Sequence, residues 1–372
     1  ENGIDGLALS WQPGLIGSPF GDAPTTYLVQ TSKDGFYWSE GISTTDTQML
    51  LETEVNTTVY ARVVAVNEGG RSFTSEVVSG HRSVDGSTAV LIVDAFDRFA
   101  TGQLFWAETT PRVGDVRRMV PDRINPHSII TPHAQAVAEM GWPFDSVSDE
   151  ALDRLDLSKY AVIIWATGEE STVDETISDA QQTRLQDYWT AGGTLFVSGA
   201  EILWDLDRRG SSSDKQFAID VLGAVLDSDT AETTTAYGVG LAAGLDLSFP
   251  DETSPYPIEW PDVFRTDRDA FAVYPDDRIA GMFGDGVALM GFPFESIGSQ
   301  SDRHELMQRL LTALVPDYTP PVLDTDTGDA VDTGERPAGG CACTHTSSPL
   351  ALWLLFAWLP SLALRRSRPS HR

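Results

Sequence analysis

In the first part of the chain, hydrophobic and polar residues alternate with a period of two. The alternation runs through residues 7–11, 26–30 and 59–66. Side chains at every second position of a strand lie on the same face, so each segment is typical of a strand with one buried face. Turn-forming residues such as Asn67-Glu68-Gly69-Gly70 separate the segments. Several short strands at this spacing predict a β-sandwich over residues 1–83.

After residue 88 the alternation gives way to uninterrupted apolar runs, which are typical of parallel strands covered by helices on both faces. The expected strands are residues 89–94, 160–165, 194–197 and 287–291. Segments with helical periodicity come between and after them, at residues 132–141, 178–190, 214–224 and 302–314. This order of elements predicts a doubly wound, flavodoxin-like α/β domain over residues 88–318.

The first segment resembles a fibronectin type III domain. Trp11 lies on an early strand, Tyr60 stands at the tyrosine-corner position, and residues 67–72 lead into the last strand. The resemblance implies that Trp11 and Tyr60 are core residues and that the module is a spacer or adhesion unit. The first strand of that fold is largely absent, so we expect the native chain to begin before Glu1.

The α/β segment resembles a group of exported bacterial proteins that carry the names ThuA, xanthan lyase or N-acetylmuramoyl-L-alanine amidase. The resemblance is carried by residues 93–98, 168–171, 198–206 and 291–295. It implies the fold of the class I glutamine amidotransferases. Fold alone does not imply an activity, because one fold hosts many chemistries.

The net charge and the positions of the cysteines exclude some classes of partner and of catalytic residue. The formal net charge is −30 and the isoelectric point is near 4.3. A surface of this charge repels phosphate backbones, so the sequence excludes nucleic acid as a partner. The two cysteines, Cys341 and Cys343, lie near the C-terminus, so residues 1–318 contain neither a disulfide nor a thiol nucleophile.

The C-terminal part changes character twice. Residues 319–340 are rich in Pro, Asp, Thr and Gly, which predicts an acidic disordered linker. Residues 341–372 contain the two cysteines, an apolar run at 349–364 and a terminal group of arginines. The run is somewhat shorter than the roughly 20 residues of a spanning helix, and the arginines after it place the C-terminus in the cytoplasm.

This tail is similar to the C-terminal sorting signals of myxobacteria and their relatives. The similarity implies processing for surface anchoring near Cys341 and Cys343. We therefore expect an exported cell-surface protein that is anchored in the membrane through residues 349–364.

Polar residues follow three of the predicted buried strands. In an open parallel sheet, ligands bind beyond the carboxyl ends of the strands, where the strand order reverses. We expect a single cleft lined from three loops, with these side chains: Asp94, Asp97, Arg98, Glu169, Glu170, Ser198 and Glu201. His133, at the start of a predicted helix, reaches this cleft only if the 99–131 loop folds back.

One hypothesis makes Ser198 a nucleophile. It occupies the strand-to-helix elbow where the amidotransferase fold places cysteine, but the elbow needs small residues on both sides and Phe196 is large. The His-x-Glu helper motif of that fold is also missing. The alternative is a serine that caps or forms a turn.

A second hypothesis pairs Glu201 with Glu170 or Glu169 as general acid and base on a glycan. The alternative is that these carboxylates cap helix N-termini, where exposed N–H groups favour negative charge. No His-x-His, His-Glu-x-x-His or paired-cysteine motif predicts a transition metal in residues 1–318. We expect no cofactor and leave open a carboxylate-held Ca²⁺ or Mg²⁺ in the same cleft.

Two functions remain open. The chain either binds or acts on cell-envelope glycan, peptidoglycan or exopolysaccharide, as a hydrolase-like protein, or it is a non-enzymatic adhesion or structural module on a degenerate amidotransferase-like scaffold.

Overall fold

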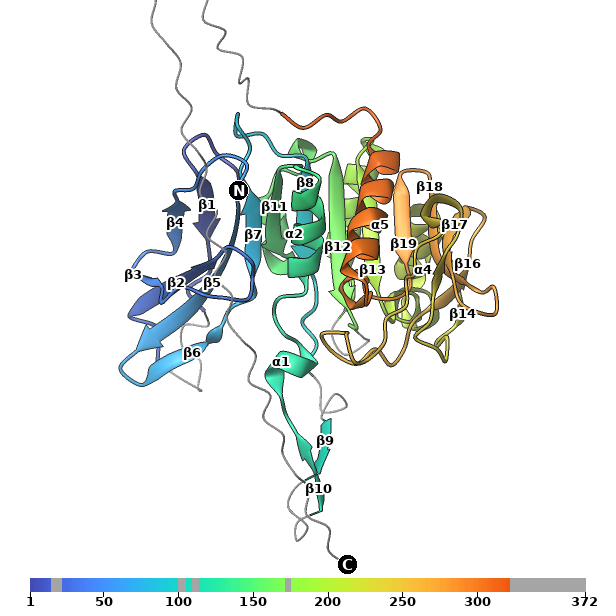
Figure 1. Ribbon diagram of the computed structural model, residues 1–372, viewed down its shortest axis with the longest axis horizontal. Helices are drawn as coiled ribbons and strands as arrows, with labels where there is room; N and C mark the ends of the chain where they lie inside the picture. The colour runs from blue at the N-terminus through green and yellow to red at the C-terminus, as the bar shows by residue number, and fades with distance from the viewer. Residues whose placement is uncertain (15–21, 100–104, 109–113, 171–174, 322–372) are drawn as a thin grey trace, which may run out of the picture. The chain divides into compact units, whose positions relative to one another are not determined.

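The computed structural model describes residues 1–14, 22–99, 105–108, 114–170 and 175–321 (Figure 1). The chain divides into two units, Glu1–Leu323 and Asp324–Arg372. Most of the predicted linker, Cys341, Cys343 and the apolar run 349–364 lie outside the described residues. Within those residues, no helix combines the length and the apolar character needed to span a membrane.

The N-terminal strands form the two facing layers of a small sandwich. One layer pairs β1 (Leu7–Ser10) with β4 (Gln48–Leu51). The other contains β2 (Thr26–Ser32), β3 (Ile42–Thr44), β5 (Thr58–Asn67), β6 (Gly70–Thr74) and β7 (Val78–His81). The alternating positions predicted to be buried supply its core, which consists of Leu9, Tyr27, Val29, Ala61 and Val63. Tyr60 is buried on the opposite face of β5, in a core that it shares with the α/β part.

Five parallel strands form the centre of the α/β part. They are β8 (Val90–Asp94), β11 (Phe144–Ser148), β12 (Val162–Gly168), β13 (Thr194–Gly199) and β19 (Val287–Met290). Their order is β11-β8-β12-β13-β19. In chain order this is 2-1-3-4-5, the flavodoxin-like arrangement that the apolar runs predict, with the reversal of strand order between β8 and β12.

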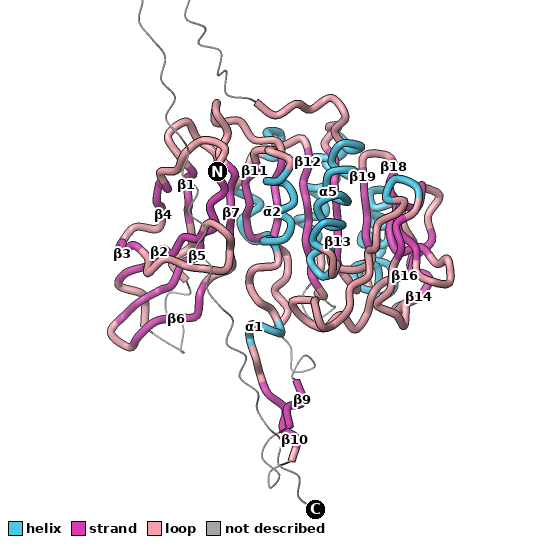
Figure 2. The backbone as a smooth tube through the Cα atoms, viewed as in Figure 1, coloured by secondary structure: helices cyan, strands magenta, loops and turns pink. Residues whose placement is uncertain are grey.

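Helices cover both faces of this sheet because its strands are apolar on both sides. On one face, α2 (Ile130–Glu139) and α5 (Gln300–Leu314) pack against Ile92, Ile164 and Phe196. Figure 2 shows α2 and α5 on the near side of the strands. On the other face, α3 (Asp179–Thr190) and α4 (Ser212–Phe217) pack against the residues between them, such as Leu91 and Leu195.

Antiparallel strands extend the sheet beyond β19. They are β14 (Val225–Ser228), β15 (Tyr237–Gly238), β16 (Val263–Arg265), β17 (Asp269–Val273) and β18 (Ile279–Gly284). A hairpin of β9 (Phe105–Glu108) and β10 (Asp115–Arg118) precedes α1 (Pro121–Ile124). Short helical turns are η2 (Asp149–Arg154), η3 (Leu157–Lys159), η4 (Trp204–Arg209), η5 (Ala218–Leu222), η6 (Gly240–Ala242) and η7 (Phe294–Ser296).

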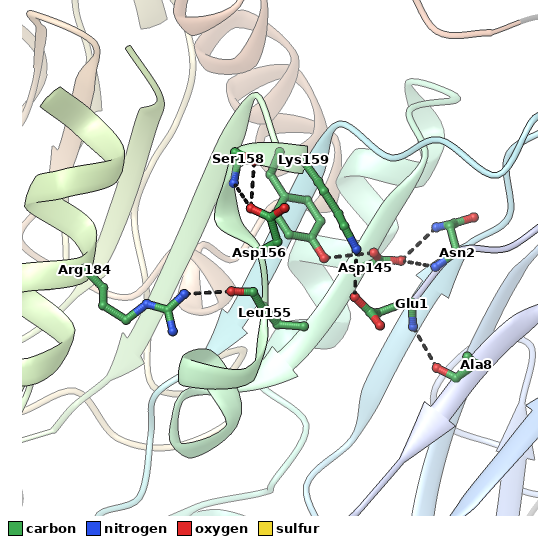
Figure 3. A network of polar contacts seen from close by, with 10 residues as sticks. Glu1, Asn2, Ala8, Asp145, Leu155, Asp156, Ser158, Lys159 and Arg184 are labelled. Carbon is green, nitrogen blue, oxygen red and sulfur yellow. Dashed lines mark hydrogen bonds and ion pairs between the residues drawn. The ribbon is translucent and has the colours of Figure 1, made fainter. Parts of the chain in front are cut away.

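The sandwich and the α/β part are joined by hydrogen bonds as well as by the chain. Strand β7 pairs with β11 through His81 and Phe144, so the sheets of both parts are continuous. The side chain of Asp145 accepts hydrogen bonds from Asn2 and from the hydroxyl of Tyr160. Figure 3 shows this network together with the ion pair between Lys159 and Glu1. The two folded parts therefore form one unit.

Candidate functional site

The strand register brings the predicted polar residues to one edge of the sheet. Asp94 lies opposite Ala166 on one side and Ser148 on the other. Ala166 in turn lies opposite Ser198. The loops that follow β8, β12 and β13 therefore begin side by side, as parallel pairing requires. The predicted convergence of these three loops is present in the structure.

Glu169 and Glu170 hold neighbouring loops by their backbones. Glu169 Oε1 accepts hydrogen bonds from the N–H groups of Glu259 and Trp260, both at 2.9 Å. Glu170 Oε2 accepts from the N–H groups of Asp97 and Arg98, at 2.8 and 3.0 Å. Both side chains are buried, and Glu170 is only 1% exposed. We call Glu169 and Glu170 the loop-anchoring pair.

Burial disfavours the charged form of Glu169 and, with the nearby charge of Glu201, raises the pKa of its carboxyl to about 8. The N–H group of Glu259 and the guanidinium of Arg98 oppose this shift. Arg98 Nη1 donates to the carbonyl of Glu169 at 3.3 Å and lies 3.6 Å from Glu201 Oε2. Arg98 thus connects the two acids that the sequence pairs as candidate catalysts.

Glu201 occupies the turn between β13 and the helix that follows it. Its backbone φ is +60°. A glutamate rarely adopts this left-handed conformation, which costs of order 1 kcal/mol or more. Its N–H group donates to the carbonyl of Trp260 at 3.3 Å. The strained elbow position is therefore held by Glu201.

Ser198 lies three residues earlier, within β13, where the sequence hypothesis had placed the elbow. Its side chain is 0% exposed, and its Oγ has no hydrogen-bond partner in the part of the chain that the structure describes. The strand continues to Gly199, because the pairing with β12 extends to Gly168. Ser198 is a strand residue rather than the residue of the turn.

The start of the helix after Glu201 already has an acidic partner. Asp262 Oδ2 accepts a hydrogen bond from the N–H group of Leu203 at 2.8 Å. Asp262 is fully buried, which raises the pKa of its carboxyl well above the usual value. Free N–H groups at this point would favour a bound anion. Sequence reasoning missed Asp262, because residues 226–285 show no regular periodicity.

His133 lies within α2, and its described contacts are with Ile129, Phe294 and Glu295. It is fully buried, with Nδ1 3.1 Å from the carbonyl of Ile129 and Nε2 3.9 Å from Glu295 Oε2. Its ring lies 4.7 Å from that of Phe294, between ring centres. Burial lowers the pKa of His133 to about 3 and raises that of Glu295 to about 7. Glu295 also accepts a hydrogen bond from the hydroxyl of Tyr256.

A second acidic group lies where β8 and β11 end. Asp97, Asp149 and Glu150 each place a carboxylate oxygen within 4.8 Å of the others, and they are the only such group among the described His, Cys, Asp and Glu residues. Burial, then the charges of Asp97 and Glu150, raise the pKa of Asp149 to about 7. Burial, then the charge of Glu295, raise the pKa of Asp94 well above its usual value, with further contributions from Asp97 and Asp149.

The sequence pattern does not single out Asp149 and Glu150, because no apolar run marks the strand before them. Strand β11 reads Phe-Asp-Ser-Val-Ser and is recognisable only through its pairing with β8. The sequence predicts Asp97 as a ligand-binding residue, but not the residues that it meets.

No protein-family model matches this chain, and no curated protein matches it. Solved structures are similar to parts of it. A human fibronectin type III domain is 26% identical, covers 23% of this chain and 79% of its own, and has a TM-score of 0.20. A glutamine amidotransferase of Thermotoga maritima is 12% identical, with 61% and 98% coverage and a TM-score of 0.36.

A β-galactosidase of Marinomonas is 13% identical with a TM-score of 0.37, covering 62% of this chain. The matched region spans 29% of that enzyme. The chain is thus similar in its parts to a fibronectin type III domain and to the glutamine amidotransferase-like fold.

Proposed function

We propose that this chain is a non-enzymatic adhesion or structural module, in which a fibronectin type III-like sandwich and a degenerate amidotransferase-like scaffold act as one rigid unit. The observation that carries the proposal is that two of the candidate catalytic acids are buried and already hydrogen-bonded to backbone N–H groups. Glu169 and Glu170 each accept two backbone N–H groups and are buried. A general acid or base must reach its substrate directly or through one water molecule.

The hypothesis that Ser198 is a nucleophile meets the same problem, because the side chain cannot reach a substrate. Ser198 is inaccessible within β13, and His133 has its contacts in the core. The amidotransferase reaction needs both an activated nucleophile at the elbow and N–H groups free to stabilise an oxyanion. Here the elbow residue is a glutamate, and Asp262 accepts one of the first N–H groups of the helix.

One observation favours the alternative, a hydrolase-like protein acting on envelope glycan or exopolysaccharide. Backbone strain persists only where the surroundings enforce it, and it is often stored at functional sites. Glu201 combines such strain with a nearby arginine, and it is 6% exposed. If the protein is an enzyme, Glu201 is the residue most suited to act in the reaction.

A turnover assay separates the two functions. The full chain, kept in a non-ionic detergent, is incubated with peptidoglycan fragments and with acidic exopolysaccharides, and released sugars and peptides are measured. We expect no release above the protein-free blank, with or without binding. Release that falls by about 100-fold or more in Glu201→Gln would establish the enzyme instead.

The matched control is Glu232→Gln. Glu232 is another glutamate with positive φ (+55°), but it is exposed. An effect shared by both variants would report backbone strain rather than chemistry at the site.

We also propose that the chain is exported and anchored at the cell surface through residues 341–372. The support is the sequence of the tail, with its two cysteines, apolar run and terminal arginines. Protease treatment of intact cells tests the proposal: residues 1–318 should be digested without lysis, whereas protection until lysis would contradict export.

A further inference from the structure

Two aromatic side chains are exposed on the loops that the loop-anchoring pair holds. Phe99 and Trp260 are each 38% exposed. Among the α/β residues whose side chains the structure describes, no other Phe or Trp is exposed. A single exposed aromatic residue is ordinary, but these two lie at the carboxyl edge of the sheet, where α/β sheets bind ligands. Their common position therefore points to a binding surface.

The backbone at both aromatic residues is fixed by two consecutive glutamates. The N–H group of Trp260 donates to Glu169 Oε1 at 2.9 Å. The N–H group of Arg98, the residue before Phe99, donates to Glu170 Oε2 at 3.0 Å. Consecutive Cα atoms are only about 3.8 Å apart, so the two aromatic loops are held to one short segment. Loops ordered in advance lose little freedom when a ligand binds.

Further contacts connect the two loops beneath the rings. Arg98 Nη1 donates to the carbonyl of Glu169 at 3.3 Å and lies 3.6 Å from Glu201 Oε2. The N–H group of Glu201 in turn donates to the carbonyl of Trp260 at 3.3 Å. The strained turn at Glu201, with φ of +60°, therefore helps to position the loop that carries Trp260. Such strain is found at ligand-binding sites.

A carboxylate stands beside each of the two rings. Asp97 lies two residues before Phe99, Glu259 comes directly before Trp260, and both acids are exposed. An ionised carboxylate accepts hydrogen bonds and cannot donate them. The ligand that suits this surface therefore combines flat apolar faces with several hydroxyl donors. A sugar ring has both, since its C–H groups form the faces and its hydroxyls form the rim.

Charge and composition select among the possible ligands. The chain has a formal net charge of −30, and the two carboxylates add local negative charge, so an anionic polysaccharide is repelled. The core of a protein–protein interface is depleted of charged residues, whereas here an acid stands beside each ring. A neutral glycan meets neither objection.

We propose that Phe99 and Trp260 form a binding surface for a neutral glycan, in which sugar rings stack on the two side chains and hydroxyls donate to Asp97 and Glu259. The inference rests on the proposed function and names the ligand of the adhesion module. It also gives the loop-anchoring pair a role, because these glutamates position the two loops and do not contact the sugar.

The test is a calorimetric titration of the full chain, kept in a non-ionic detergent without a sugar head group. The probes are three neutral hexasaccharides, namely cellohexaose, maltohexaose and chitohexaose, with hexagalacturonic acid as the anionic comparison. We expect at least one neutral probe to bind with a Kd on the order of 10⁻⁴ to 10⁻³ M, as suits a small ligand on an open surface. The anionic probe should bind at least about tenfold more weakly.

Four variants make the titration specific. Phe99→Ala and Trp260→Ala should each raise the Kd by about tenfold or more, because each removes a stacking surface. Trp260→Phe keeps a ring and should stay within about threefold of the wild type. Tyr237→Ala removes an aromatic side chain that is 49% exposed on β15 and should leave the Kd unchanged. Thermal unfolding of each variant shows that it is folded.

Four results would overturn the proposal. No neutral probe binds at about 10 mM, or the Kd is the same in the wild type and in both alanine variants at positions 99 and 260, or hexagalacturonic acid binds as tightly as the neutral probes. The fourth is a dimer in sedimentation that Trp260→Ala dissociates, because it would assign the surface to a second copy of the chain.

The same titration separates this inference from the proposed function. Release of shorter sugars from a bound hexasaccharide would contradict the non-enzymatic function and leave the binding surface in place. Absence of binding would remove the surface and leave a structural module.

Discussion

Two groups of acids lie at the same edge of one sheet, and what differs between them is their partners. The loop-anchoring pair, Glu169 and Glu170, accepts four backbone N–H groups in all. In the second group, Asp97, Asp149 and Glu150 place carboxylate oxygens within 4.8 Å of one another, and Asp149 Oδ2 accepts a hydrogen bond from Gln181. Asp97 links the two groups, because its N–H group binds Glu170 while its carboxylate faces Asp149.

Burial and charge therefore do not by themselves define a site. A buried carboxylate with two N–H donors is satisfied and stabilises the loops that it holds. A carboxylate beside other carboxylates is repelled by their charges, which raises its pKa.

Removing an anchoring acid should cost the most. Glu170→Ala leaves the N–H groups of Asp97 and Arg98 without their acceptor, so we expect a loss of roughly 2–4 kcal/mol in the free energy of unfolding. Urea denaturation in EDTA measures this loss. Under the same conditions Asp149→Ala should cost little or stabilise. Equal losses in the two variants would break the distinction between the groups.

The pH dependence should give a smaller effect with a definite sign. The pKa of Glu169 is about 8 in the folded protein, against 4.5 for an unperturbed glutamate. The folded state therefore binds the proton more tightly, so the contribution of Glu169 is fully present below pH 4.5 and is lost as the pH rises through 8. In EDTA, stability should fall between pH 5 and pH 9.

Glu169→Gln keeps an oxygen for the N–H groups of Glu259 and Trp260 but cannot ionise. The fall in unfolding free energy over this pH range should shrink by roughly 1–3 kcal/mol in the variant. Chemical denaturation at each pH provides the measurement. An unchanged slope would mean that Glu169 is ionised in the folded protein at neutral pH.

Much of the fold could be predicted from the sequence. The period-two segments and the apolar runs form strands. A strand buried on one face alternates apolar and polar residues, and a strand buried on both faces is apolar throughout. A fibronectin type III domain and a glutamine amidotransferase are weak structural neighbours of the two parts, at low identity and partial coverage. Strand β11 could not be found in this way, because an acidic residue, Asp145, stands at one of its buried positions. Hydrogen bonds from Asn2 and Tyr160 hold the carboxylate of Asp145 there.

The candidate site was predictable in location but not in detail. Residues after the strands meet at one edge because parallel pairing fixes where strands end. Which residue takes the strained turn depends on how far β13 pairs with β12, and this moves the elbow from Ser198 to Glu201. The roles of Glu169, Glu170 and Asp262 depend on N–H groups distant in the sequence, and these have no signature in residue order.

The most direct test of the contrast is a crystal structure of the protein. We predict that Asp97, Asp149 and Glu150 place carboxylate oxygens within 4.8 Å of one another. Glu169 and Glu170 should keep their N–H partners. Two backbone N–H donors on the carboxylate of Asp149, or their absence from Glu169 and Glu170, would contradict the account.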